Sequence, residues 1–201
     1  GDRLADAIRS KIGTDLIEDL PVKFTAVAAD IAAEKEHWFQ SGPVDQAIRA
    51  SVSLPLFFTP HTVDGVQLID GGILNPTPIE PTLADDTDLT VAVDLGGPMM
   101  KQAIPEPEKA QSPWHQKMDD FLESMKFSES KPKDQWDMLY IADQSFNTMQ
   151  NAIARERMAD NPPDHLIAVP RNKCGTLEFD RSAEMIEYGY QLAEKQLSGK
   201  I

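Results

Sequence analysis

Three aspartates stand at the ends of apolar runs and could each supply a carboxylate for chemistry. Asp30 lies near the end of "VKFTAVAADI", Asp70 ends "VQLID", and Asp94 ends "LTVAVD". Ligands bind outside the carboxyl ends of strands in open parallel sheets, so position alone makes each a candidate general base. Only Asp70 is followed at once by two glycines, Gly71 and Gly72. Glycines there leave room for close approach of another segment or a substrate.

A carboxylate in this position could activate a serine. A serine hydroxyl is a weak nucleophile until a positioned base takes its proton, and partial burial raises the basicity of a carboxylate. Asp-Gly is also a common turn dipeptide, so a purely structural corner at Asp70 stays open on pattern alone. Ser51 and Ser53 are the serines nearest to Asp70 in the sequence. Both follow a predicted helix, where backbone hydrogen bonding is the expected role.

The elements that must hold these aspartates follow from apolar patterning. The runs at 22–31 and 89–97 are apolar on both faces and predict buried strands, which favours an α/β fold with an at least partly parallel sheet. Asp64-Gly65 predicts a two-residue hairpin leading into the strand that ends at Asp70. Helical periodicity is found at residues 2–12, 45–51 and 136–158 and after Asp180, and Asp45 is the expected N-cap of the second of these helices.

Composition excludes several function classes. The chain has 201 residues, 33 acidic against 19 basic, and a formal charge of −14. It would repel nucleic-acid phosphates, so we expect no nucleic-acid partner. No apolar run approaches the ~18 residues of a membrane span. The single cysteine, Cys174, rules out an internal disulfide, and the four histidines show no metal-ligand spacing, so we expect no metal site. A cytoplasmic location is expected, with a membrane-peripheral one left open.

One block carries a specific resemblance. Residues 44–79, "VDQAIRASVSLPLFFTPHTVDGVQLIDGGILNPTPI", resemble the second signature block of bacterial patatin-like phospholipases. The family pattern is a helical A-x-R-A-S, a Ser-x-Pro, an F-x-P, a hairpin, Asp-Gly-Gly and Asn-x-x-Pro. The matching residues are Ala47, Arg49, Ala50, Ser51, Ser53, Pro55, Phe58, Pro60, Asp70, Gly71, Gly72, Asn75 and Pro78. The resemblance extends over about residues 1–98 and 164–198.

This resemblance implies a three-layer α/β fold with a mainly parallel sheet between helices. It also implies a lipid acyl ester hydrolase that uses a serine–aspartate dyad, with a phospholipid or other lipid ester as substrate. Asp70 matches the base, and Gly71 and Gly72 shape its loop. No metal or cofactor is implied. Transient contact with a membrane surface and a homo-oligomer are both compatible with such an enzyme.

The chain departs from the family in one respect. The family's serine stands in a G-x-S-x-G motif preceded by a glycine-rich loop, and neither occurs in these 201 residues. We therefore expect residues 1–201 to be the C-terminal portion of one patatin-like domain, with a variable insertion at about 98–135. The serine would lie in an upstream segment, and the chain alone would be inactive. The alternative is a non-catalytic binding or regulatory module that lacks the nucleophile.

Overall fold

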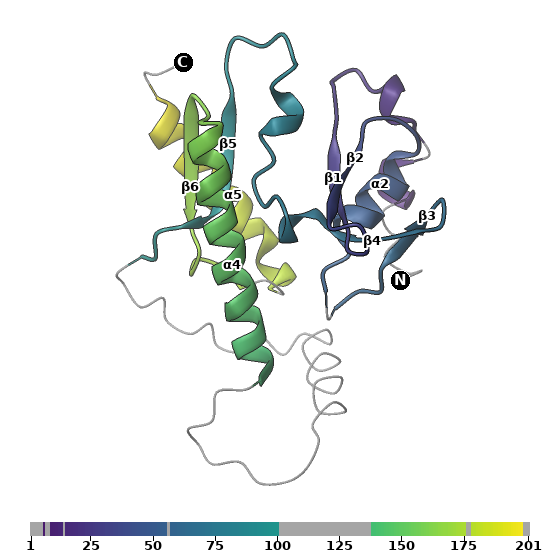
Figure 1. The fold of residues 1–201 in the computed structure, drawn as a ribbon. Coiled ribbons are helices and arrows are strands. Elements are labelled where there is room, and N and C mark those ends of the chain that lie inside the picture. The colour runs from purple at the N-terminus through teal and green to yellow at the C-terminus, as the bar shows by residue number, and fades with distance from the viewer. Residues whose placement is uncertain are drawn as a thin grey trace, which may run out of the picture.

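A computed structural model of the chain describes residues 6, 9–13, 15–55, 57–100, 138–175 and 178–198. The described residues form two sheets, each with its own helices (Figure 1). The larger sheet has the strand order β2-β1-β4-β3. Its strands are β1 (Ala26–Asp30), β2 (Lys35–Phe39), β3 (His61–Val63) and β4 (Val66–Asp70). Short 3₁₀ turns are η1 (Ile17–Asp19), η2 (Gly71–Ile73), η3 (Glu80–Thr82) and η4 (Phe179–Arg181).

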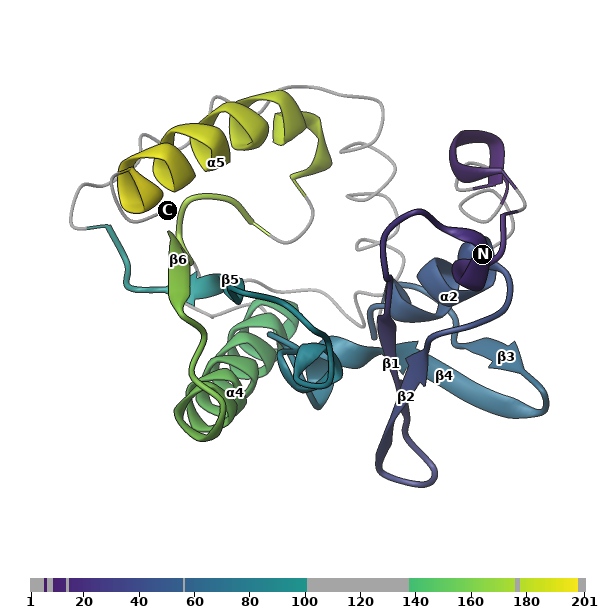
Figure 2. The same ribbon diagram turned by 90° about the horizontal axis from the view of Figure 1, so that it is seen from above.

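The smaller sheet is a parallel pair, β5 (Val91–Gly97) and β6 (His165–Pro170). Helix α4 (Met138–Asp160) packs against β5, and helix α5 (Ser182–Leu197) packs against β6. Figure 2 shows these two helices on opposite sides of the pair, which gives a helix–sheet–helix arrangement. The α/β class and a parallel sheet between helices are therefore confirmed.

The direction of the other strands differs from the expected mainly parallel sheet. Among the described strands, β1 pairs antiparallel with both β2 and β4, and β3 pairs antiparallel with β4. Short connections explain the β1–β2 and β3–β4 pairings. Only residues 31–34 separate β1 from β2, and two residues separate β3 from β4, whereas a parallel crossover needs a dozen or more. Strand β1 reads as apolar on both faces because it is the buried inner strand of this sheet.

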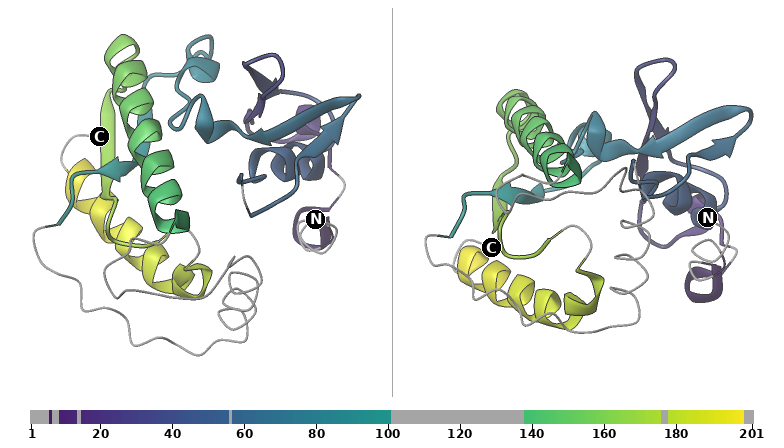
Figure 3. Two further views of the ribbon diagram at one scale, coloured as in Figure 1. Left: turned by 60° about the horizontal axis from the view of Figure 1, so that its bottom comes forward. Right: turned by 90° about the horizontal axis from the view of Figure 1, so that it is seen from below.

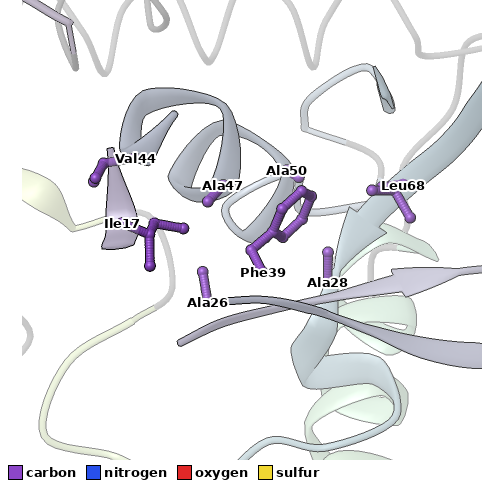
Figure 4. Close-up of a cluster of buried hydrophobic side chains, with 8 residues drawn as sticks. All are labelled: Ile17, Ala26, Ala28, Phe39, Val44, Ala47, Ala50 and Leu68. Carbon is purple, nitrogen blue, oxygen red and sulfur yellow. The ribbon is translucent and has the colours of Figure 1, made fainter. Parts of the chain in front are cut away.

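Helix α2 (Val44–Ser51) covers one face of the larger sheet and closes its core. Buried side chains from the sheet and from α2 meet there, and Figure 4 shows Phe39 and Leu68 with the alanines of the helix and of β1. The prediction that Asp45 is the N-cap of this helix is wrong. Pro43 holds that position, and Asp45 is buried and paired with Arg9, its Oδ2 lying 2.9 Å from the guanidinium.

The hairpin prediction at Asp64-Gly65 is confirmed. Asp64 has φ of 50° and Gly65 of 82°, the left-handed values that a type I′ turn requires. The β3–β4 hairpin extends away from the layer of α4, β5 and β6 in both views of Figure 3. Residues 101–137 lie outside the described part, so the expected insertion at 98–135 and the domain assignment of 1–201 stay predictions.

Candidate active site

Asp70 is the last residue of β4 and caps the turn that follows. Its backbone N–H donates to the carbonyl of Ser53, 3.1 Å away. Its side-chain Oδ1 accepts from the N–H of Gly72 at 2.7 Å. Burial raises the pKa of Asp70, and the Gly72 N–H acts in the opposite direction. The carboxylate is therefore fixed in one orientation and is a stronger base than an exposed aspartate.

The two glycines after Asp70 are required by close neighbours. A Cβ on Gly71 would lie 2.3 Å from the backbone oxygen of Val27 on β1. A Cβ on Gly72 would lie 3.0 Å from Asp70 Oδ1 and equally close to Nε2 of Gln150 on α4. Gly71 thus allows β4 to continue past the backbone of β1, and Gly72 leaves room beside the carboxylate.

A pocket of about 300 Å³ opens beside this turn. Asp70, Gly71 and Gly72 line it together with residues of β1, α2 and the loop after the turn. Its wall is largely apolar and includes Phe24 and Ile48. An apolar pocket with one oriented carboxylate suits a substrate that has a hydrocarbon part and one reactive polar group.

A buried polar network joins the loop after Asp70 to α4. Asn75 is 2% exposed, and its Nδ2 donates to Glu36 at 3.1 Å and to Glu80 at 2.9 Å. Arg157 of α4 contacts the same two carboxylates, at 2.6 and 2.9 Å. Burial acts to raise the pKa of Glu80, but hydrogen bonds from Asn75 and Arg157 bring it below its usual value. The network therefore holds α4 against the loop that carries the carboxylate.

Asp30 and Asp94 do not join Asp70. All three side chains accept backbone N–H groups two residues ahead, at 2.7–3.0 Å. Because β1 and β4 are antiparallel, Asp30 lies toward the opposite end of the sheet, level with Leu68. Asp94 belongs to the other sheet. Of the three, only Asp70 lines the pocket.

The two serines expected to bond the backbone have different surroundings. Ser53 is fully buried; its Oγ donates to the carbonyl of Arg49 at 2.8 Å and accepts from the Arg49 guanidinium at 2.5 Å. The structural role predicted for Ser53 is confirmed, because Ser53 also anchors the backbone of Asp70. Ser51 lines the pocket beside Asp70.

Sequence reasoning missed Gln150 and Arg157. Both lie on the face of α4 that packs toward the turn, as does the buried Ala154 between them. The available signal was the polar spacing of Asp143, Asn147, Gln150 and Arg157, which recur every three to seven residues along one side of the helix.

No described helix has the length and apolarity to span a bilayer. Within the described ranges, no three His, Cys, Asp or Glu side chains gather closely enough to hold a metal ion. Burial raises the pKa of the Cys174 thiol, which keeps it protonated.

Comparisons with known proteins agree with the signature block. Residues 1–83 match the sequence model of the patatin-like phospholipases. An uncharacterized NTE family protein of Mycobacterium tuberculosis strain H37Rv is 33% identical, over 98% of this chain and 68% of its own length. Lysophospholipase NTE1 of Pyricularia oryzae is 24% identical, over 95% of this chain and 12% of its own length. A patatin-like phospholipase domain-containing protein 7 of Rattus norvegicus is 32% identical over 40% of this chain and 6% of its own.

The match to the mycobacterial relative covers nearly all of this chain and just over two thirds of the relative. It includes the turn at Asp70, the hairpin before it and the parallel pair after it. The chain belongs to the patatin-like phospholipase family.

Proposed function

We propose that the complete protein hydrolyses carboxylic esters of lipids through an acyl-serine intermediate, with Asp70 as general base. The observation that carries this is the state of the Asp70 carboxylate. It is partly buried, fixed by the Gly72 N–H at 2.7 Å, and lies on a largely apolar pocket. A carboxylate with a raised pKa accepts a proton from an alcohol more readily than an exposed one.

The balance of the reaction follows from these groups. The serine oxygen attacks the ester carbonyl while its proton passes to Asp70, and the protonated Asp70 then returns the proton to the leaving alcohol. In the second half water attacks the acyl-serine and gives its proton to Asp70; the acyl–Oγ bond then breaks, the fatty acid leaves, and Asp70 returns the proton to the serine oxygen. The serine is proposed to lie in a segment outside these 201 residues, since the G-x-S-x-G motif is absent from them. Backbone N–H groups of that segment would stabilise the oxyanion.

The test is a parallel measurement of three variants in the complete protein. Asp70→Asn keeps the shape and the bond to Gly72 but removes the base, so kcat/KM should fall by ~10²–10⁴-fold. Asp30→Asn and Asp94→Asn are matched controls, because both side chains accept similar backbone N–H groups away from the pocket. They should retain most of the activity. An equal loss in all three, or a near wild-type rate for Asp70→Asn, would rule out the assignment.

One observation favours a second candidate, a non-catalytic binding module: no G-x-S-x-G motif occurs in this chain. The gene sequence upstream of Gly1 separates the two. An in-frame glycine-rich loop and serine motif within about a hundred residues supports the enzyme, because a typical domain has ~100–200 residues. Upstream sequence without such a motif supports the module.

A further inference from the structure

Gln150 lies beside the candidate base, and its side-chain amide forms no hydrogen bond within the described part of the chain. It is half-buried on α4. Its Nε2 and the Asp70 Oδ1 both lie 3.0 Å from one point, the position that a Cβ on Gly72 would occupy. The half-buried amide donor and the half-buried carboxylate therefore flank the same glycine, and a hydrogen bond between them requires a rotation of the Gln150 side chain.

In a serine–aspartate dyad, a donor beside the aspartate would help to orient its carboxylate. No histidine stands between base and nucleophile, so the carboxylate itself must be oriented. One oxygen must remain free to take the serine proton. Asp70 Oδ1 already accepts one N–H from Gly72 and has a second lone pair, since a carboxylate oxygen can accept two bonds. A second donor on Oδ1 would lock the carboxylate plane and leave Oδ2 free.

We propose that Gln150 is a positioning residue for Asp70: its Nε2–H donates to Oδ1 and fixes the carboxylate for proton transfer. The inference rests on the proposed function for its catalytic meaning, but the contact itself does not depend on hydrolysis. Helix α4 is held in the required register by Arg157, which lies two turns further along and contacts Glu36 and Glu80.

Other charged groups near Asp70 do not account for its raised pKa. The elements packed against Asp70 and its turn are β1, α2, β3 and α4. Their titratable and charged groups in the described part are Asp30, Asp45, Arg49, His61, Asp143, Arg155, Glu156, Arg157 and Asp160. None of these is among the causes of the raised pKa of Asp70, which are burial and the opposing Gly72 N–H. A new donor at Oδ1 should therefore change the pKa of Asp70 measurably.

The first measurement is the pKa of Asp70 by carboxyl carbon NMR in the complete, substrate-free protein. A hydrogen bond to the charged form lowers a pKa, so Gln150→Leu should raise it, by roughly half a unit to one unit. Gln150→Glu keeps the shape but places a second carboxylate there, and should raise it further. Gln144→Leu is the matched control, because Gln144 is an exposed glutamine on the same helix. It should leave the pKa unchanged.

The second measurement is the pH profile of kcat/KM. The acidic limb should move upward with the pKa in both Gln150 variants, and kcat should fall about 10-fold while KM changes little. If the NMR pKa of Asp70 is unchanged in both variants, the proposal is wrong. An unchanged pKa together with a raised KM would instead make Gln150 a substrate contact. If the pKa shifts but the protein hydrolyses no ester, the contact stands and the proposed function fails.

Discussion

At the residue scale, alanine substitution of the two glycines after Asp70 should have different effects: Gly71→Ala should mainly reduce stability and Gly72→Ala should mainly reduce activity. Gly71→Ala would place a Cβ 2.3 Å from the Val27 backbone, which cannot move without shifting β1. We expect a loss of about 1–3 kcal/mol in the free energy of unfolding. Gly72→Ala meets only side-chain ends, Asp70 Oδ1 and Gln150 Nε2, at 3.0 Å. It should cost little stability but displace the carboxylate and reduce kcat.

Chemical denaturation and steady-state kinetics on both variants check this contrast. Gly189→Ala on α5 is the control, because a Cβ there has no neighbour within 4 Å. It should stabilise the protein by about 0.5–1 kcal/mol, the usual gain from replacing glycine within a helix. Equal destabilisation by Gly71→Ala and Gly72→Ala would mean that the turn is not built as described.

A second prediction at this scale concerns the pH dependence of stability. Burial raises the pKa of Asp70 in the folded protein, so its charged form is disfavoured there. The stability that goes with the protonated form is fully present below the unfolded pKa and is lost as the pH rises through the folded pKa. Asp70→Asn carries no charge and keeps an acceptor for the Gly72 N–H. Its Tm should equal or exceed that of the wild type at pH 7.

The difference between the two melting temperatures should shrink as the pH falls toward 3.8, the ordinary pKa of this side chain. Thermal melts at several pH values on the complete protein measure it. A variant clearly less stable than the wild type at pH 7 would show that a charged partner stabilises the Asp70 carboxylate.

At the scale of elements, an arginine on α4 links the helix to β2 and to the loop after Asp70. Arg157 contacts Glu36 and Glu80, and these carboxylates also accept from Asn75. Arg157→Met leaves two partly buried carboxylates without their cation and should cost about 1–3 kcal/mol at pH 7. It should also lower kcat, because Gln150 lies on the same helix. Arg155→Met is the control on the exposed side, and it should be nearly neutral.

The cost of Arg157→Met should depend on pH with a definite sign. The pKa of Glu80 lies below its ordinary value, so the stability from its charged form is present above the unfolded pKa of about 4.5. It is lost as the pH falls through the folded pKa. Melts of both proteins should therefore converge in strong acid. A cost that persists unchanged there would assign the effect to lost packing of the arginine stem.

The elements also show what sequence alone could predict. The hairpin at Asp64-Gly65 was predictable because the turn depends on two residues with positive φ. The strand-end turn at Asp70 followed from the same local chemistry. The direction of β1 did not, since an inner antiparallel strand and a parallel one share the same apolar pattern. Gln150 was not predictable because only tertiary packing brings α4 beside the turn.

At the scale of the whole molecule, α5 covers only part of one face of the parallel pair. Ile167 and Val169 on β6 are buried, whereas Val93 and Leu95 on β5 are 53% and 70% exposed. Val93 pairs with Ile167 in register, and partners in register point to the same face of a sheet. Among the described strands, β5 also has no partner on its other edge. An apolar face beside an open edge favours association.

We therefore predict that the 201-residue polypeptide self-associates through β5. The double variant Val93→Thr with Leu95→Thr places β-branched residues, which suit a strand, at both positions but removes most of the apolar face. Light scattering coupled to size exclusion should show a smaller species for the variant than for the wild type. Ile186→Thr is the control, because Ile186 is an equally exposed apolar side chain (73%) on α5 and not on β5; this variant should leave the size unchanged. In a longer protein whose upstream segment covers β5, the double variant should instead lower Tm, because polar groups would then be buried. A monomeric wild-type polypeptide that melts cooperatively would contradict both expectations and favour the binding-module alternative.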